Sequence, residues 1–140
     1  MHSIVKDWGP VILWAALIFY SSTDTFSAQN TSLIVGPLVL WVFPNISSEE
    51  LEIFYHTTRK FAHWAEYFIF ALLLMRAFRV QKSNESGRQR TGRALVIVLI
   101  YALSDEFHQM FVPSRSPLLS DVILDVFGGV CGVMVYSYVK

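Results

Sequence analysis

Residues 61–80 read FAHWAEYFIFALLLMRAFRV, an apolar stretch of the length that an α-helix needs to cross a membrane. With three further apolar stretches, it gives the expected spans 4–22, 59–80, 94–112 and 118–139. The composition agrees, because 54% of the 140 residues are apolar and 16% are charged, whereas soluble domains carry about 25% charge. We therefore expect a single domain that is an all-α integral membrane bundle of four transmembrane helices.

The composition also excludes several classes of protein. Eleven Lys and Arg balance eleven Asp and Glu, so the basic excess typical of a nucleic-acid-binding domain is missing. Because Cys131 is the one cysteine, a disulfide framework and a cysteine-based zinc site are excluded. An aromatic content of 15% excludes an intrinsically disordered chain.

The segment between the first two spans, residues 23–58, contains a further apolar run, LIVGPLVLWVF at 33–43. That run is too short to cross a membrane alone. Gly36 and Pro37 inside it oppose a continuous helix. We expect a short re-entrant or interfacial segment between helices 1 and 2, with Trp41 in the headgroup layer.

The distribution of basic residues predicts the orientation. The loop at 81–93, together with the flanking end of the second span, holds six of them: Arg76, Arg79, Lys82, Arg88, Arg90 and Arg93. By the positive-inside rule this loop is cytoplasmic. Segment 23–58 contains no Lys or Arg and is therefore expected outside. Both termini then lie in the cytoplasm, and the protein is a multi-pass protein of the cell membrane.

Ionisable side chains gather in the outer part of three spans. Arg59, His63 and Glu66 have the spacing i, i+4 and i+7, so a helix presents them on one face. Asp121 and Asp125 share a face in the same way. In the third span, Glu106 lies about 100° around the helix axis from Asp105. The full candidate set is Arg59, Lys60, His63, Glu66, Asp105, Glu106, His108, Gln109, Arg115, Asp121 and Asp125.

The depth of these residues can be counted from the external ends of the spans. At ~1.5 Å per residue, Glu66, Asp105 and Asp125 each lie roughly 10 Å inside the hydrocarbon. Such a residue costs at least ~2.5–3.5 kcal/mol there unless it faces the bundle interior, pairs or is protonated. The small residues Gly128 and Gly132 would allow close helix packing nearby. The sequence therefore predicts a polar pocket that opens to the outer leaflet.

Basic side chains at the outer rim favour the binding of an anion. Guanidinium groups present paired donors to phosphate or carboxylate. Lipid headgroups and lipid-linked cell-wall intermediates carry such anions, so membrane lipids are the expected partners. In this interpretation Arg59, Lys60 and Arg115 hold the anion. The polar floor is formed by the acids and histidines together with Gln109, Asp121 and Asp125.

Two other interpretations use the same residues. In the first, the histidines and carboxylates act as general acid and base in a membrane-embedded hydrolase or transferase. A divalent metal that activates water is compatible with this chemistry but not required. The candidate catalytic residues are His63, Glu66, Asp105, Glu106 and His108. In the second, basic and acidic side chains form a structural ion-pair lattice in a scaffold protein.

Three blocks of this sequence resemble the signatures of VanZ-like membrane proteins. They are RKFAHWAEY at 59–67, SDEFHQMFVPSR at 104–115 and DVILDVFGG at 121–129. They occur in the matching order and spans, the pair Ser21-Ser22 also fits, and Ser114 stands where the family has a glycine. The resemblance implies a bacterial cell-envelope protein, and the name-giving member is associated with low-level resistance to teicoplanin. It does not imply a particular reaction.

Overall fold

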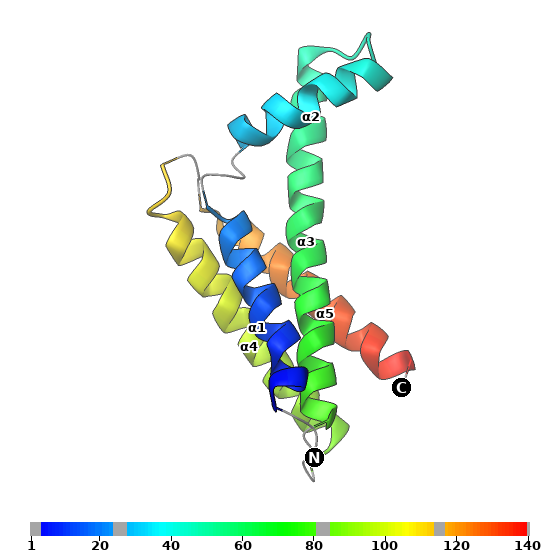
Figure 1. Cartoon of the computed structure of the whole chain (residues 1–140), viewed down its shortest axis with the longest axis vertical. Helices are drawn as coiled ribbons and strands as arrows, with labels where there is room; N and C mark the ends of the chain where they lie inside the picture. Colours follow the sequence, from blue (N-terminus) through cyan, green and yellow to red (C-terminus); the bar gives the residue numbers. More distant parts are fainter. Residues whose placement is uncertain (1–3, 24–27, 81–84, 114–116, 140) are drawn as a thin grey trace.

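The computed structural model describes residues 4–23, 28–80, 85–113 and 117–139, and these residues form five α-helices and no strands. The expected all-α class is therefore confirmed for the described part of the chain. Figure 1 shows the helices in order. They are α1 (Ile4–Ser21), α2 (Ala28–Val42), α3 (Ser48–Val80), α4 (Gly87–Gln109) and α5 (Leu119–Val139).

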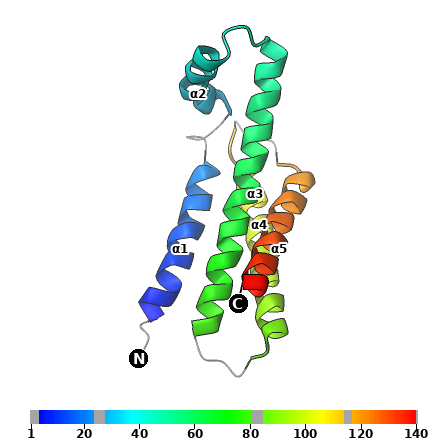
Figure 2. The same cartoon turned by 90° about the vertical axis from the view of Figure 1, so that its right-hand side faces the viewer.

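The 33-residue helix α3 is the axis of the bundle and contacts each of the other four helices. Helix α5 crosses it obliquely and also contacts α4, while α2 lies beyond the end of α1 (Figures 1 and 2). The core is built mainly from apolar side chains on one face of α3. Its buried members include Tyr67, Phe70, Ala71, Leu74 and Phe78 of α3, Ile18 of α1 and Val98 of α4.

Two capping boxes define where the long helices begin. Ser47 precedes α3, and its hydroxyl accepts from the Glu50 N–H at 3.2 Å, while the Glu50 carboxylate accepts from the Ser47 N–H at 2.9 Å. Ser86 and Gln89 make the same reciprocal pair at the start of α4. Such pairs satisfy backbone donors that a helix leaves without partners. Because of the first box, α3 begins well before the expected span at 59–80.

Glycines on one stripe of α5 bring its backbone against α3. A Cβ added to Gly128 would lie 2.3 Å from the Trp64 carbonyl oxygen, and one added to Gly132 would lie 2.4 Å from that of Phe68. Both distances are far below van der Waals contact. Close approach of a neighbouring helix to this stripe is therefore confirmed. It fixes the height at which α5 crosses α3.

Three helices, α1, α3 and α5, have the length and hydropathy to cross a membrane. Their outer faces are apolar, as the high exposure of Leu13 and Ile123, both 65%, shows. Helix α4 is long enough, but its apolar part lies between Arg93 and Asp105, so any stretch of spanning length includes several charges. The described residues thus give three clear candidate spans where four were expected.

The expected break at Gly36-Pro37 is wrong, because α2 continues through Pro37. A proline removes one backbone hydrogen bond, and the loss of about 3 kcal/mol can be offset by packing. Here a Cβ on Gly36 would lie 2.7 Å from the Tyr55 hydroxyl, so the helix packs closely on α3. Figure 2 shows α2 beside the first turns of α3, and Trp41 is 82% exposed. Of the two expectations, this placement favours an interfacial helix over a re-entrant one.

Candidate functional site

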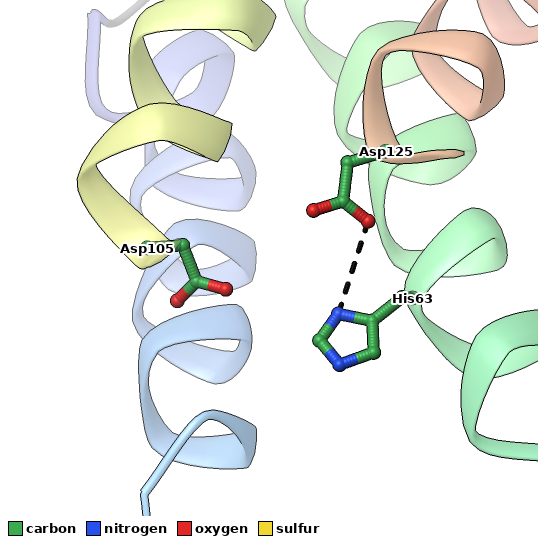
Figure 3. Close-up of side chains that lie close together, drawn as sticks. All are labelled: His63, Asp105 and Asp125. Atoms are coloured by element: carbon green, nitrogen blue, oxygen red, sulfur yellow. Dashed lines mark ion pairs between the residues drawn. The ribbon is translucent and has the colours of Figure 1, made fainter. Parts of the chain in front are cut away.

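Helices α3, α4 and α5 bring His63, Asp105 and Asp125 together in the interior of the bundle (Figure 3). One nitrogen or oxygen atom of each side chain lies within 4.8 Å of those of the other two, and all three residues are buried. The Nδ1 atom of His63 is 3.8 Å from Oδ1 of Asp125. We call these three residues the trio. They come from three separate parts of the sequence.

Glu66 joins the trio to helix α1. Its Oε2 atom is 3.9 Å from Nδ1 of His63, one turn earlier on α3. The Ser21 hydroxyl donates to Oε1 of Glu66 at 2.8 Å, and the indole N–H of Trp14 donates to the Glu66 carbonyl oxygen at 2.8 Å. The last turns of α1 are therefore held against the site by polar contacts as well as by packing.

Asp105 is held by two donors on the same oxygen. Oδ2 accepts from the Ser22 hydroxyl at 2.9 Å and from the Gln109 side-chain amide at 3.0 Å. Ser22 and Gln109 are themselves 0% and 1% exposed. Since hydrogen bonds to a charged group are stronger than neutral ones, this arrangement fixes the orientation of the carboxylate.

Glu106 and Asp121 extend the buried acidic group toward the α4–α5 connection. Both are buried, although the helical spacing placed Glu106 on a different face from Asp105. Oε2 of Glu106 accepts from the Leu118 N–H at 2.9 Å, just before α5 begins. The charges that act on Glu106 include those of Asp121, Asp105 and Arg59. The Leu118 N–H, just before α5, thus binds this carboxylate between α4 and the start of α5.

The remaining predicted site residues lie farther out. His108 is half-buried and packs on Phe19 of α1, with the ring centroids 4.3 Å apart. Arg59 is half-buried and Lys60 is exposed. Within the described part of the chain, neither base is within ion-pair distance of a carboxylate, so a lattice of basic and acidic side chains is not seen there. Arg115 lies outside the described residues, as does the start of the loop 81–93.

Two other residues of the site were missed by sequence reasoning. The Tyr67 side chain is 0% exposed, and its hydroxyl has no hydrogen-bond partner among the described residues. The charges of Asp105, Asp125 and Glu66 act on this hydroxyl. An aromatic residue in an apolar span is expected to belong to the hydrophobic core, so the type and position of Tyr67 did not indicate a role in the site. Ser22 had a signal, since it belongs to a polar pair that ends an apolar span.

The chemistry of this group of residues follows from its composition. We call His63, Glu66, Tyr67, Asp105, Glu106, Gln109, Asp121 and Asp125 the polar layer. It contains five carboxylates and one histidine, all in the described part of α3, α4 and α5. Asp125 is fully buried, and neither of its oxygens has a hydrogen-bond partner in the described residues. Such a layer suits proton transfer or cation binding, while anions require the nearby bases.

Comparison with known proteins gives a family match over nearly the whole chain. The model of the VanZ/LLP1 family matches residues 8–140, which include every residue of the polar layer. No curated protein and no solved structure matches the chain.

Proposed function

The chain belongs to the VanZ/LLP1 family, and from this premise we propose that it binds an anionic lipid, or a lipid-linked cell-wall intermediate, at its polar layer. Burial of ionisable side chains inside a membrane bundle is costly and is associated with function. The five carboxylates of the layer cannot attract an anion themselves. The proposal therefore depends on the bases next to them.

The observation that carries the proposal is the environment of Arg59. This residue precedes His63 by one turn of α3, so the two lie on the same face of the helix. It is half-buried and has no carboxylate within ion-pair distance among the described residues. A guanidinium group in this position has paired donors available for a phosphate. Lys60 beside it adds a second positive charge at the rim.

The proposed topology places this rim at the outer leaflet. Helix α4 is the fourth membrane span, with its charged ends shielded by the polar layer on one side and by the interface on the other. Both termini and the α3–α4 connection are cytoplasmic, because the arginines at 88, 90 and 93 lie there. Figure 1 supports the arrangement, since α1 begins near the end of the bundle at which α3 ends and α4 begins.

Single cysteines in a Cys131→Ala background test the topology. Asn45 and Gly87 are exposed, and a Cβ on Gly87 meets only the end of the Arg90 side chain, at 4.0 Å. In intact cells, Asn45→Cys is expected to react with an impermeant maleimide, and Gly87→Cys is expected to react only after permeabilisation. Labelling of Gly87→Cys from outside would reverse the orientation.

Lipid binding is tested with purified protein and two anionic probes, phosphatidylglycerol and undecaprenyl phosphate, with phosphatidylcholine as the neutral reference. Arg59→Gln is expected to weaken anion binding about 10- to 150-fold, the equivalent of about 1.5–3 kcal/mol for hydrogen bonds to a charged group. Native mass spectrometry of lipid titrations gives the affinities. A preference between the two probes distinguishes a phospholipid headgroup from a lipid-linked intermediate.

Arg88→Gln is the matched control, because Arg88 is an exposed arginine at the opposite end of the bundle. It is expected to leave the affinity within about twofold of the wild type. Unchanged binding in Arg59→Gln, with weakened binding in Arg88→Gln, would instead assign the lipid to the cytoplasmic end and contradict the proposal.

Hydrolysis or group transfer on a lipid-linked substrate is a second candidate function. The observation that favours it is the position of His63, whose Nδ1 atom lies between two carboxylates at 3.8 and 3.9 Å. These distances exceed those of hydrogen bonds, and a small side-chain movement would bring a carboxylate within reach of the imidazole proton. Incubation with undecaprenyl pyrophosphate and measurement of released phosphate tests turnover. His63→Gln is expected to abolish release without loss of lipid binding, whereas no release from the wild type would reject this candidate.

A role in glycopeptide resistance is proposed on the family resemblance. Expression of the chain in a teicoplanin-susceptible Gram-positive host is expected to raise the inhibitory concentration of teicoplanin, and Arg59→Gln is expected to remove the increase. Equal inhibitory concentrations with and without the chain would separate this protein from resistance while leaving the lipid proposal to its own test.

A further inference from the structure

We propose that the trio of His63, Asp105 and Asp125 binds one divalent transition-metal ion of the class of Zn²⁺ or Mn²⁺. Helices α3, α4 and α5 contribute one ligand each, and the three side chains point toward a common space (Figure 3). One imidazole nitrogen with two carboxylate oxygens is a donor set that these ions accept. The inference goes beyond the proposed function, because it holds whether or not a lipid binds.

The distances allow such an ion after a small adjustment. The ligand atoms of the trio lie within 4.8 Å of one another. Two ligand atoms bound to zinc at about 2.0–2.2 Å in tetrahedral geometry lie roughly 3.3–3.6 Å apart. Side-chain movements of about 1 Å at the ligand atoms would bring the group to such separations.

Charge balance favours a cation at this position. Asp125 is fully buried, and no lysine or arginine within the described residues lies at ion-pair distance from it. A buried carboxylate without compensating charge is strongly disfavoured. A divalent ion with two carboxylates and a neutral imidazole has zero net charge, so its binding removes this cost.

Surrounding residues hold the ligands as they do in established metal sites. Ser22 and Gln109 both donate to Oδ2 of Asp105, which fixes the plane of that carboxylate. Oε2 of Glu66 lies 3.9 Å from His63 Nδ1, so this carboxylate is near enough to act as a further ligand after a side-chain movement. Hydrogen bonds of this kind from outside the ligand set orient ligands and raise metal affinity.

Tyr67 supplies an observation that is independent of the carboxylates. Its side chain is completely buried, and its hydroxyl has no hydrogen-bond partner among the described residues. Electrostatic interaction with Asp105 and Asp125 places the hydroxyl in the layer of the trio. A buried hydroxyl is normally hydrogen-bonded. A water or hydroxide on the metal ion would provide the partner that this hydroxyl lacks.

The first experiment measures metal binding by the whole chain in detergent, without added lipid, after removal of metal with EDTA. Equilibrium dialysis against Zn²⁺ and against Mn²⁺ is expected to give one bound ion per chain for at least one of them. Asp125→Asn is expected to lower the affinity at least tenfold. Asp7→Asn is the matched control, because Asp7 is a buried carboxylate at the start of α1 and lies outside both the polar layer and the trio. It is expected to bind within about threefold of the wild type.

A second variant keeps the proposal testable if Asp125→Asn does not fold. In a Cys131→Ala background, Asp125→Cys replaces a carboxylate ligand with a thiolate of smaller size. Addition of Co²⁺ is expected to produce a thiolate-to-cobalt charge-transfer band, because soft thiolate ligands bind such ions directly. The same substitution at Asp7 is expected to give no band.

The outcomes separate this inference from the proposed lipid function. Absence of stoichiometric metal, or equal metal binding in wild type and Asp125→Asn together with no charge-transfer band in Asp125→Cys, would overturn the metal site. Metal binding without any lipid binding would leave the metal site intact and reject the lipid proposal. Lipid binding that is lost in Arg59→Gln, with no metal bound in any variant, would do the reverse.

Discussion

The two ends of the α3–α4 pair are both rich in charge, but they accommodate it in opposite ways. At the basic end, where α3 ends and α4 begins, the charged side chains are mostly exposed. Arg93 forms an ion pair with Glu85, and its guanidinium lies 4.4 Å from the centroid of the Phe78 ring. At the polar layer, by contrast, Asp125 is fully buried and has no hydrogen-bond partner within the described residues.

The basic end also contains a cavity that positively charged side chains line. Residues that line a cavity of about 560 Å³ at the basic end include Arg79, Arg88 and Arg90. The positive-inside rule accounts for these arginines if this end of the bundle faces the cytoplasm, as we propose. No such explanation covers buried negative charge, which costs free energy and contributes little to stability. The comparison supports two of our proposals, that the polar layer serves binding or chemistry and that the basic end sets the membrane orientation.

The largest expected effect comes from the packing that creates the polar layer. Gly132→Ala places a Cβ 2.4 Å from the Phe68 carbonyl oxygen, so α5 must move away from α3. We expect a loss of about 1–3 kcal/mol in the free energy of unfolding, and no folded protein from Gly132→Val. Thermal unfolding in detergent measures the effect, with the reactivity of the half-buried thiol of Cys131 as the signal that is monitored.

Gly92→Ala is the control for this substitution. Gly92 is a helical glycine near the basic end, and a Cβ there meets nothing within 4 Å. Replacement is expected to stabilise the protein by about 0.4–1 kcal/mol through the unfolded state. Equal effects at the two glycines would show that close packing of α5 does not form the layer.

The second prediction concerns the cost of charge within the layer. In metal-free protein, Asp125→Asn keeps the side-chain volume and removes a carboxyl group that is buried close to those of Asp105 and Glu66. We expect it to increase the free energy of unfolding by about 0.5–3 kcal/mol. Most single substitutions change this free energy by a similar amount but decrease it. Thermal unfolding after EDTA treatment is the measurement. A clear decrease would mean that Asp125 has a purely structural role.

A smaller effect is expected at the basic end. Arg93→Ala removes a partly exposed ion pair and a contact with the Phe78 ring, so the loss should be about 0.2–1 kcal/mol. The effect should shrink at high salt, because exposed charges are screened. Unfolding midpoints in low and high NaCl test this. A loss as large as that of Gly132→Ala would remove the distinction between the two ends.

The smallest effect is expected at the start of α3, outside both regions. The pKa of Glu50 is lowered mainly because its carboxylate accepts a hydrogen bond from the backbone N–H of Ser47. A hydrogen bond from the Ser47 hydroxyl adds to this effect. Because the pKa is lowered in the folded state, the ionised Glu50 carboxylate stabilises the folded helix end at a pH above the ordinary pKa of Glu. This stabilisation is lost as the pH falls through the lowered pKa. The first turn of α3 should therefore fray in acid.

Amide exchange at the first turn of α3, measured from about pH 6 to about pH 3 after correction for intrinsic rates, detects this fraying. Glu50→Gln is expected to make the corrected protection independent of pH. The neighbouring acid Glu49 is the control, since Glu49→Gln should preserve the wild-type pH dependence. Protection that stays constant in the wild type would contradict the role of the capping box.

Much of the fold could be predicted because apolar periodicity and length identify membrane-type helices directly. Helices α1, α3 and α5 were expected for this reason, and the glycine stripe of α5 indicated close packing. Helix α2 could not be predicted correctly, because the effect of Pro37 depends on packing of Gly36 against Tyr55. The local sequence shows that a proline destabilises a helix, but it does not show the contact with another helix that offsets this destabilisation.

The candidate site could be predicted in part. Spacing along each helix grouped the acids and histidines by face and depth, so the approach of α3, α4 and α5 was an expectation from the sequence. It could not identify the three side chains that meet. His63 joins Asp105 and Asp125, while His108 turns to Phe19 on α1. Rotation of each helix about its own axis decides this difference.

The sequence by itself determined the helical class, the membrane character and most of the ionisable residues of the polar layer, because all three follow from composition and periodicity along single segments. The tertiary structure decided which of these residues are neighbours. It also turned Glu106 inward and brought the Tyr67 hydroxyl into the polar layer. The physical reason is that contacts between helices depend on their crossing height and rotation, and the glycines of α5 fix these only once α3 lies against them.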